Sequence, residues 1–222
     1  MISIKALRHH LLDIPDLTLD THSIAVIGHN GAGKTTLLEV LAGMDRPLAG
    51  DVLIDGIEPC KRRVGWVGEF PDRTMLFSKV YDEVASSFRF TKVDAEETDR
   101  EVKSALALLG KEGLIDRSTR SLSGGEKALV AFAAAIANRP DILILDEVDS
   151  HLDEISSEII DDAVSASGLP VVYCTQDMDR AAKAETVVLM ERGRVSSCGT
   201  PSEVFTDMEG SCLYPSIWRL GL

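Results

Sequence analysis

The spacing of apolar residues divides the chain into segments with a period of about two and segments with a helical period. The strand-like stretch 17–27 contains a polar turn at residues 20–23. A helix-like stretch at 37–42 ends at Gly43. The pair Asp55-Gly56 is typical of a tight turn between two strands. The predicted strand segments of this first part are 2–7, 17–27, a hairpin at 51–57, and 64–67.

Beyond residue 78 the apolar residues recur at helical intervals among charged ones. The positions that carry this pattern are Val80, Val84 and Phe88, then Val102, Leu106 and Leu109. We interpret the region as a helical subdomain, at about 78–120, inserted into a single domain that spans residues 1–222. Strand and helix then alternate: a helix to 138, a strand 142–145, a helix from 154, and strands 171–174, 187–190 and 194–197. Such alternation predicts an α/β fold with a parallel-rich core sheet covered by helices.

Composition excludes several classes of function. The 222 residues include 23 Lys and Arg against 36 Asp and Glu, a net charge of −13, and such an acidic chain without a basic cluster is unsuited to nucleic acid. Its longest wholly apolar stretch, 128–137, is about half a membrane span, and no cleavable signal opens the sequence. Four cysteines without a C-x-x-C pair suit reduced thiols in the cytoplasm. Any membrane connection is therefore expected through a partner.

One glycine-rich segment carries most of the functional information. The apolar run 24–27 leads into Gly28-His29-Asn30-Gly31-Ala32-Gly33-Lys34-Thr35-Thr36, and a helix-like stretch follows. A strand, a glycine-rich loop and a helix with G-x-x-x-x-G-K-T spacing are typical of a phosphate-binding loop, because glycines let backbone N–H groups face an anion at a helix N-terminus. Lys34 would reach the β- and γ-phosphates and the Thr35 hydroxyl would ligate Mg²⁺. The predicted nucleotide-binding residues are Gly28, Asn30, Gly31, Ala32, Gly33, Lys34, Thr35 and Thr36.

Two further segments complete the pattern. The predicted strand 142–145 ends in Asp146, placed to orient Mg²⁺, and Glu147, placed to polarise the attacking water. Ser123, followed three residues later by Glu126, predicts a capping box at the start of a helix. Gly124 and Gly125 would expose the N-terminal amides of that helix and make a second anion site with Ser123. One chain does not easily use two such sites on one γ-phosphate, whereas two chains placed head to tail can.

These motifs resemble the nucleotide-binding subunit of ATP-binding-cassette (ABC) transporters over essentially the whole chain. The family's phosphate loop falls on 28–35, its signature on 122–126, its Walker B strand on 142–147 and its D-loop on 150–153. The resemblance implies a P-loop NTPase fold with a parallel-rich core sheet, an N-terminal antiparallel β portion and an inserted helical subdomain. It also implies ATP, Mg²⁺ and a head-to-tail dimer with an identical or different ABC ATPase subunit. In that dimer Ser123, Gly124 and Gly125 would contact the partner's ATP.

Several segments are similar to the cobalt-type and energy-coupling-factor ATPases that drive vitamin and metal-ion uptake. These segments are 64–67, 71–72, 80–85 and 199–205. This resemblance implies an importer ATPase held on the cytoplasmic face of the membrane by a transmembrane subunit. A shorter likeness, at 145–150, is to the soluble ABC ATPase of iron–sulfur cluster assembly. A low-activity regulatory nucleotide-binding module is the third alternative.

Two positions depart from the family's pattern. Glu69 stands where the family has its Q-loop glutamine, so a carboxylate replaces a neutral amide near Mg²⁺. Gln176 stands where the family has its switch histidine, and an amide can donate a hydrogen bond to the γ-phosphate but cannot carry a proton. We therefore expect Glu147, Gln176 and Glu69 in catalysis, Thr35, Asp146 and Glu69 near the metal, and slow turnover. The family's adenine-stacking aromatic is also missing, and His9 or His10 are candidates to replace it.

Overall fold

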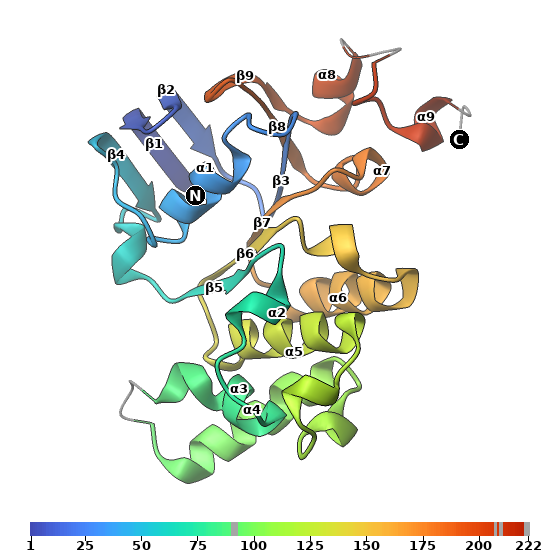
Figure 1. The fold of residues 1–222 in the computed structure, drawn as a ribbon. Helices are drawn as coiled ribbons and strands as arrows, with labels where there is room; N and C mark the ends of the chain where they lie inside the picture. The colour runs from blue at the N-terminus through green and yellow to red at the C-terminus, as the bar shows by residue number, and fades with distance from the viewer. Residues whose placement is uncertain (90–92, 207, 209–210, 220–222) are drawn as a thin grey trace. The chain divides into compact units, whose positions relative to one another are not determined.

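The computed structural model (Figure 1) describes residues 1–89, 93–206, 208 and 211–219. The chain divides into two compact units. The first comprises Met1–Arg62, Ile144–Glu147 and Pro170–Leu222, and the second comprises Arg63–Leu143 and Val148–Leu169. The helical subdomain predicted at about 78–120 falls within the sequence range of the second unit.

An antiparallel sheet with the strand order β2-β1-β4 opens the first unit. The strands are β1 (Ile2–His9), β2 (Leu12–Leu19) and β4 (Ala49–Ile54). β2 begins at Leu12 rather than at residue 17, so this part of the sequence prediction was wrong. The Asp55-Gly56 turn is present with φ values of 47° and 75°. After this turn the chain forms only a single bridge, between Ile54 and Ile57. The predicted hairpin therefore has one full strand, β4, and this strand pairs with β1.

The larger sheet has the order β5-β6-β7-β3-β8-β9. β3 (Ser23–Ile27) lies between β7 (Val171–Cys174) and β8 (Thr186–Glu191) and is parallel to both, whereas β9 (Arg194–Gly199) is antiparallel to β8. The three parallel strands β3, β7 and β8 are almost wholly buried. Their sequences are therefore continuously apolar rather than alternating. The segments that follow β3 and β7 leave the sheet at the same edge, because parallel strands end together there.

The helices of the first unit are short. α1 (Lys34–Leu41) follows the loop after β3 and buries Leu37, Leu38 and Leu41. It ends before Gly43, where φ is 70° and a Cβ atom would lie 2.6 Å from the backbone nitrogen of Cys60. The remaining described helices are α7 (Met178–Ala181), α8 (Pro201–Thr206), α9 (Ser216–Arg219) and the 3₁₀ turn Pro59–Lys61.

The second unit is built around α5 (Gly124–Ala137), which packs against α3 (Val80–Val84), α4 (Ala95–Leu108) and α6 (Glu154–Ser167). All six apolar residues that set the helical period between Val80 and Leu109 are buried. β5 (Val64–Val67) and α2 (Pro71–Thr74) precede this bundle, and part of β6 (Ile142–Asp146) follows it. Short 3₁₀ turns lie at Ala85–Phe88, Glu112–Leu114, Thr119–Ser121 and Val148–His151.

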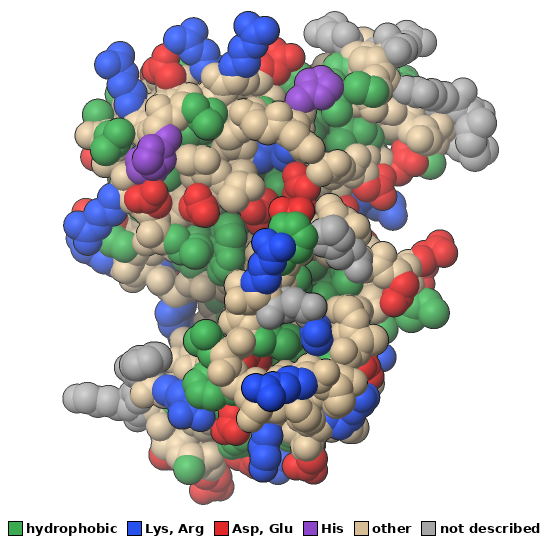
Figure 2. Space-filling model, viewed as in Figure 1, with side chains coloured by type: hydrophobic (Ala, Val, Ile, Leu, Met, Phe, Trp, Pro, Cys, Tyr) green, Lys and Arg blue, Asp and Glu red, His purple; other side chains and the backbone are tan. Residues whose placement is uncertain are grey.

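Parallel strands, a separate antiparallel sheet and packed helices confirm the predicted fold class. On the face drawn in Figure 2, Lys and Arg side chains are interspersed with Asp and Glu. In the described part of the chain, no helix combines the length and apolarity that a membrane span requires.

Candidate functional site

The loop between β3 and α1 takes a conformation that depends on its glycines. Gly28, Gly31 and Gly33 have φ values of 145°, 80° and 100°, in the region that residues with side chains rarely adopt. At Gly28 a Cβ atom would also overlap the carbonyl oxygen of Met190 in β8. Gly33 is the N-cap of α1 and has no side chain that could cap the first amides of this helix. These amides are therefore left for an anion.

Lys34, the first residue of α1, is only 4% exposed. Its ammonium donates a hydrogen bond to the carbonyl oxygen of Gly28 at 3.0 Å. It also lies 3.3 Å from Oε1 of Glu147. The cation is thus held beside the loop by a backbone acceptor and a carboxylate, and a triphosphate bound in the loop would meet an ammonium that is already oriented.

Asp146, at the end of β6, is buried and accepts two hydrogen bonds at its Oδ1 atom. The Thr35 hydroxyl donates at 3.3 Å and the Cys174 thiol donates at 2.7 Å. Burial, and next the negative charge of Asp146, raise the pKa of the Cys174 thiol far above its usual range, so the thiol stays protonated and remains a donor. Adjacent hydroxyl and carboxylate oxygens are ligands that suit Mg²⁺. Sequence reasoning missed Cys174, because nothing in the motif marks it.

Glu147 follows Asp146 with φ of 46°, which is uncommon for a residue other than glycine. Its amide donates to the carbonyl oxygen of Cys174 at 3.1 Å, which joins the ends of β6 and β7. The Oε2 atom of Glu147 accepts a hydrogen bond from the side-chain amide nitrogen Nε2 of Gln176 at 2.6 Å. Nε2 of Gln176 also lies 3.5 Å from Oδ1 of Asn30. Glu147 is therefore fixed between Lys34 and Gln176. Strained backbone of this kind is frequent at functional sites.

The predicted signature residues lie in the second unit. Ser123 Oγ accepts from the amide of Glu126 at 3.2 Å, and Glu126 Oε2 accepts from the amide of Ser123 at 2.8 Å, which confirms the capping box. A Cβ atom at Gly124 would meet no other atom within 4 Å. At Gly125 it would lie 2.5 Å from Oγ of Ser156, so packing requires glycine only at the second position.

Glu69 also belongs to the second unit, where it lines a pocket. Phe70, which is 38% exposed, lines the same pocket, and the guanidinium of Arg73 lies 4.5 Å from the centre of its ring. The other lining residues are Pro71, Gly124, Ala128, Val148 and Leu152. Within this unit the Q-loop position and the first signature glycine therefore face one cavity.

The adenine candidates differ in exposure. His9 is 3% exposed and its Nε2 atom lies 2.8 Å from Oδ2 of Asp45, so its ring offers no free face for stacking. His10 is exposed. Leu11 lies against the phosphate loop, because its Cδ1 atom is 2.8 Å from the place that a Cβ of Gly33 would take. Leu11 is 48% exposed and so presents an apolar surface beside the loop.

Comparison with known proteins identifies the family. A family model described as ABC transporter matches residues 15–150, more than half of the chain, and the chain belongs to this family. It is 36% identical over 198 residues to a putative ABC transporter ATP-binding protein of Methanosarcina acetivorans, covering 84% of this chain and 61% of the relative. It is 39% identical over 199 residues to the energy-coupling factor transporter ATP-binding protein EcfA2 of Methanospirillum hungatei, covering 84% of this chain and 50% of the relative. The chain thus spans between half and two thirds of the length of these two proteins.

A solved structure is similar over almost its full length. It is CbiO1 of Clostridium perfringens, described as part of the ABC transporter complex CbiONQ, with a TM-score of 0.82 and 29% sequence identity. The match covers 94% of this chain and 91% of that one. The predicted likeness to energy-coupling-factor and cobalt-type ATPases is therefore confirmed.

Proposed function

We propose that this chain is the ATP-hydrolysing subunit of an ABC importer for a metal ion or a vitamin. The observation that carries the proposal is the contact of Glu147 with both Lys34 and Gln176, beside the hydrogen-bonded pair of Thr35 and Asp146. A phosphate-binding cation, a carboxylate base and a pair of hard oxygen ligands are the groups that ATP hydrolysis requires. The similarity to energy-coupling-factor and CbiO ATPases supports the importer class.

Binding of ATP rests on the loop residues 28–36 and on Leu11. Lys34 and the uncapped amides of α1 take the β- and γ-phosphates, and Leu11 offers apolar surface to the base. Thr35 and Asp146 would hold Mg²⁺, and the fit rests on their adjacent hydroxyl and carboxylate oxygens. When bound, Mg²⁺ neutralises charge on the phosphates.

Catalysis rests on the release of Glu147. When the phosphates draw Lys34 away, the Glu147 carboxylate loses its cation and is free to accept a proton from the attacking water. Gln176 keeps that carboxylate oriented and donates hydrogen bonds with an uncharged amide. Glu69 adds negative charge where the family has an amide. These two departures are the reason why we expect slow turnover.

The partners follow from the family. A second ABC ATPase subunit, identical or different, would dock head to tail, so that Ser123, Gly124 and Gly125 contact its ATP. A transmembrane subunit would hold the pair on the cytoplasmic face of the membrane. We expect no role for nucleic acid.

Two variants test the nucleotide chemistry. Lys34→Ala should lose ATP binding, whereas Glu147→Gln should bind ATP, fail to hydrolyse it and accumulate an ATP-bound dimer. Hydrolysis by Glu147→Gln at the parent rate would show that Glu147 is not the base.

Copurification from detergent-solubilised membranes tests the biological role. An integral membrane subunit supports the importer, and a cytosolic scaffold supports the iron–sulfur assembly alternative.

A further inference from the structure

Two histidines and an aspartate form a cluster in the first unit that the proposed ATPase chemistry does not use. Nε2 of His9 lies 2.8 Å from Oδ2 of Asp45, and Nε2 of His10 lies 3.8 Å from the same oxygen. One potential ligand atom from each of the three residues lies within 4.8 Å of the other two. The two imidazole rings meet edge to face, with their centroids 4.2 Å apart.

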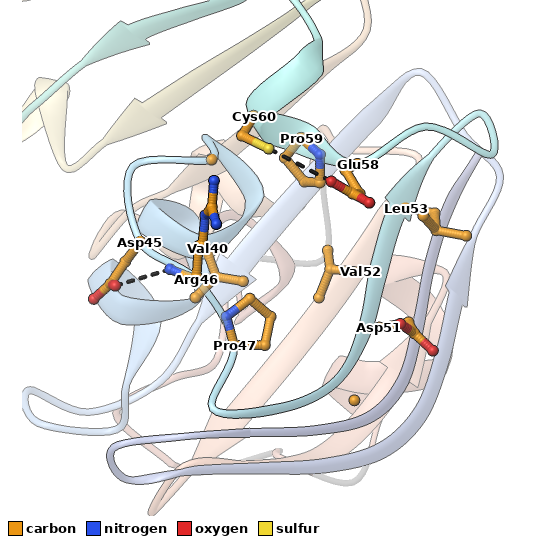
Figure 3. A pocket seen from close by; sticks show the side chains of 12 residues that line it. Val40, Asp45, Arg46, Pro47, Asp51, Val52, Leu53, Glu58, Pro59 and Cys60 are labelled. Atoms are coloured by element: carbon orange, nitrogen blue, oxygen red, sulfur yellow. Dashed lines mark hydrogen bonds between the residues drawn. The ribbon is translucent and has the colours of Figure 1, made fainter.

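The fold holds these groups from two separate segments. His9 is the last residue of β1 and is buried, and His10 follows it in the turn to β2 with φ of 47°. Asp45 lies beyond the end of α1. Its Oδ1 atom accepts the backbone N–H of Arg46 at 2.8 Å, the bond dashed in Figure 3. Its other oxygen, Oδ2, faces both imidazoles.

We propose that His9, His10 and Asp45 bind a divalent transition-metal cation of the Zn²⁺, Ni²⁺ or Co²⁺ class. Two imidazole nitrogens and one carboxylate oxygen favour such ions over Mg²⁺ or Ca²⁺, which prefer oxygen ligands. Ligands bonded at about 2.0–2.1 Å to a tetrahedral ion lie roughly 3.3 Å apart. The two separations of 2.8 and 3.8 Å from Oδ2 of Asp45 bracket this value. The ligand atoms of the two histidines lie within 4.8 Å of each other, and an adjustment of the exposed His10 side chain completes the site. Water fills the remaining positions.

His9 also sets a limit on the affinity. Its Nδ1 atom is buried and has no hydrogen-bond partner in the described part of the chain. A metal on Nε2 requires the ring proton to sit on Nδ1, where no acceptor stabilises it. Missing support of this kind costs about 10–100-fold in metal affinity. We therefore expect a dissociation constant on the order of micromolar, well above that of a structural zinc site.

The test is calorimetric titration of the nucleotide-free full chain with NiCl₂. Cys60, Cys198 and Cys212 are exposed thiols and are replaced by Ser, because thiolates bind the same cations. Excess Mg²⁺ is present to occupy the Thr35–Asp146 pair. One equivalent of Ni²⁺ should bind, and the cation should raise the melting temperature because it binds only the folded chain. This outcome does not depend on the proposed ATPase activity.

The variants are chosen so that the fold survives. His10→Asn suits a left-handed backbone, and Asp45→Asn keeps an acceptor for the Arg46 amide. Each should weaken Ni²⁺ binding at least about tenfold, the effect of losing one of three ligands. His22→Ala, at an exposed histidine outside the cluster, should bind as the parent does. Absence of binding by the parent, or equal binding by parent, His10→Asn and Asp45→Asn, would overturn the proposal.

Discussion

The ammonium of Lys34 lies 3.3 Å from Oε1 of Glu147, so the cation proposed to hold the phosphates is paired with the carboxylate proposed to activate water. Their side chains are only 5% and 11% exposed. In an ion pair with so little solvent, desolvation offsets much of the attraction, but leaving one partner alone is costly. In this arrangement the arrival of ATP and the release of the base are one event, because both depend on Lys34 leaving Glu147.

A double-mutant cycle in the nucleotide-free protein tests this pairing. Lys34→Ala leaves Glu147 hydrogen-bonded to the Gln176 amide but without its cation, and should lower the free energy of unfolding by about 3 kcal/mol, the low end of the range for breaking a buried pair. Adding Glu147→Gln should recover part of that loss, because the uncompensated charge is gone. Urea unfolding of the four proteins measures the coupling. Strictly additive losses would show that the pair contributes nothing.

Cys174 should position Asp146. Its thiol donates to Oδ1 of Asp146 at 2.7 Å, and this bond helps to fix the carboxylate beside Thr35. Cys174→Val removes the donor and keeps an apolar side chain, whereas Cys174→Ser keeps a donor. We expect the valine variant to need about tenfold more Mg²⁺ for half-maximal ATP binding, the effect of losing a group that orients a metal ligand. The serine variant should stay near the parent. Equal Mg²⁺ dependence of all three proteins would refute the role.

Much of the local structure could be predicted from the sequence, because local chemistry determines it. The capping box at Ser123, the positive φ values at Asp55 and Gly56, and the glycine conformations of the phosphate loop each depend on residues within a few positions. The site contacts of Glu147 were not predicted. They depend on which strands lie side by side, and that order is a property of the whole sheet.

The start of β2 shows how a local pattern can mislead. Residues 12–19 alternate buried and exposed, but the alternation breaks at Pro15 and Asp16, which are both exposed. Strand β1, which pairs with β2, is irregular at the same place. Ala6 has φ of 50°, and the register of the β1–β4 pairing shifts between Lys5 and Arg8. Such a bulge changes the phase of a strand, so a search for a strict period of two finds only the second half.

The proposed signature contact in trans is best tested at Gly124. A side chain there meets open space, so Gly124→Asp should fold normally and place negative charge where a partner's γ-phosphate docks. We expect near-normal ATP binding by the monomer and loss of the ATP-dependent dimer in light scattering, with Gly124→Ala as the neutral control. Normal dimerisation of Gly124→Asp would contradict the head-to-tail arrangement.

The neighbouring positions are poorer choices for this test. Gly125→Asp would collide with Ser156 and with Asp153, whose Oδ2 atom is 3.0 Å from the new Cβ, so a loss of dimer there would report folding. Ser123→Arg removes the N-cap of α5, which costs about 1 kcal/mol by itself.

Glu69 should slow hydrolysis in a cation-dependent way. Glu69→Gln restores the neutral amide of the family and removes repulsion towards the triphosphate, so we expect faster turnover and a weaker Mg²⁺ requirement. Glu96→Gln, an equal loss of charge at an exposed position of α4, is the control and should change neither. The measurement is steady-state ATPase activity over a range of Mg²⁺ concentrations. Identical behaviour of both variants and the parent would show that Glu69 exerts no such effect.

Gln176 is the position where a single substitution should raise activity most. Its amide nitrogen donates to Glu147 at 2.6 Å, and a histidine at this position could keep a donor while also carrying a proton. Hydrogen bonds from a charged donor are about twice as strong as neutral ones. We expect Gln176→His to raise the ATPase rate roughly tenfold, which corresponds to about 1.4 kcal/mol of transition-state stabilisation.

The same variant should gain a pH dependence that the parent lacks. Histidine titrates near pH 6.5, so the charged donor is present below that value and is lost as the pH rises through it. The advantage of Gln176→His over the parent should therefore shrink towards pH 8.5 in steady-state assays at saturating Mg-ATP. Gln176→Ala serves as the control, because it deletes the donor and leaves Glu147 without the 2.6 Å contact, and it should fall below the parent at every pH. Superimposable profiles for the histidine variant and the parent would show that this position does not limit catalysis, and slow turnover would then rest on Glu69 alone.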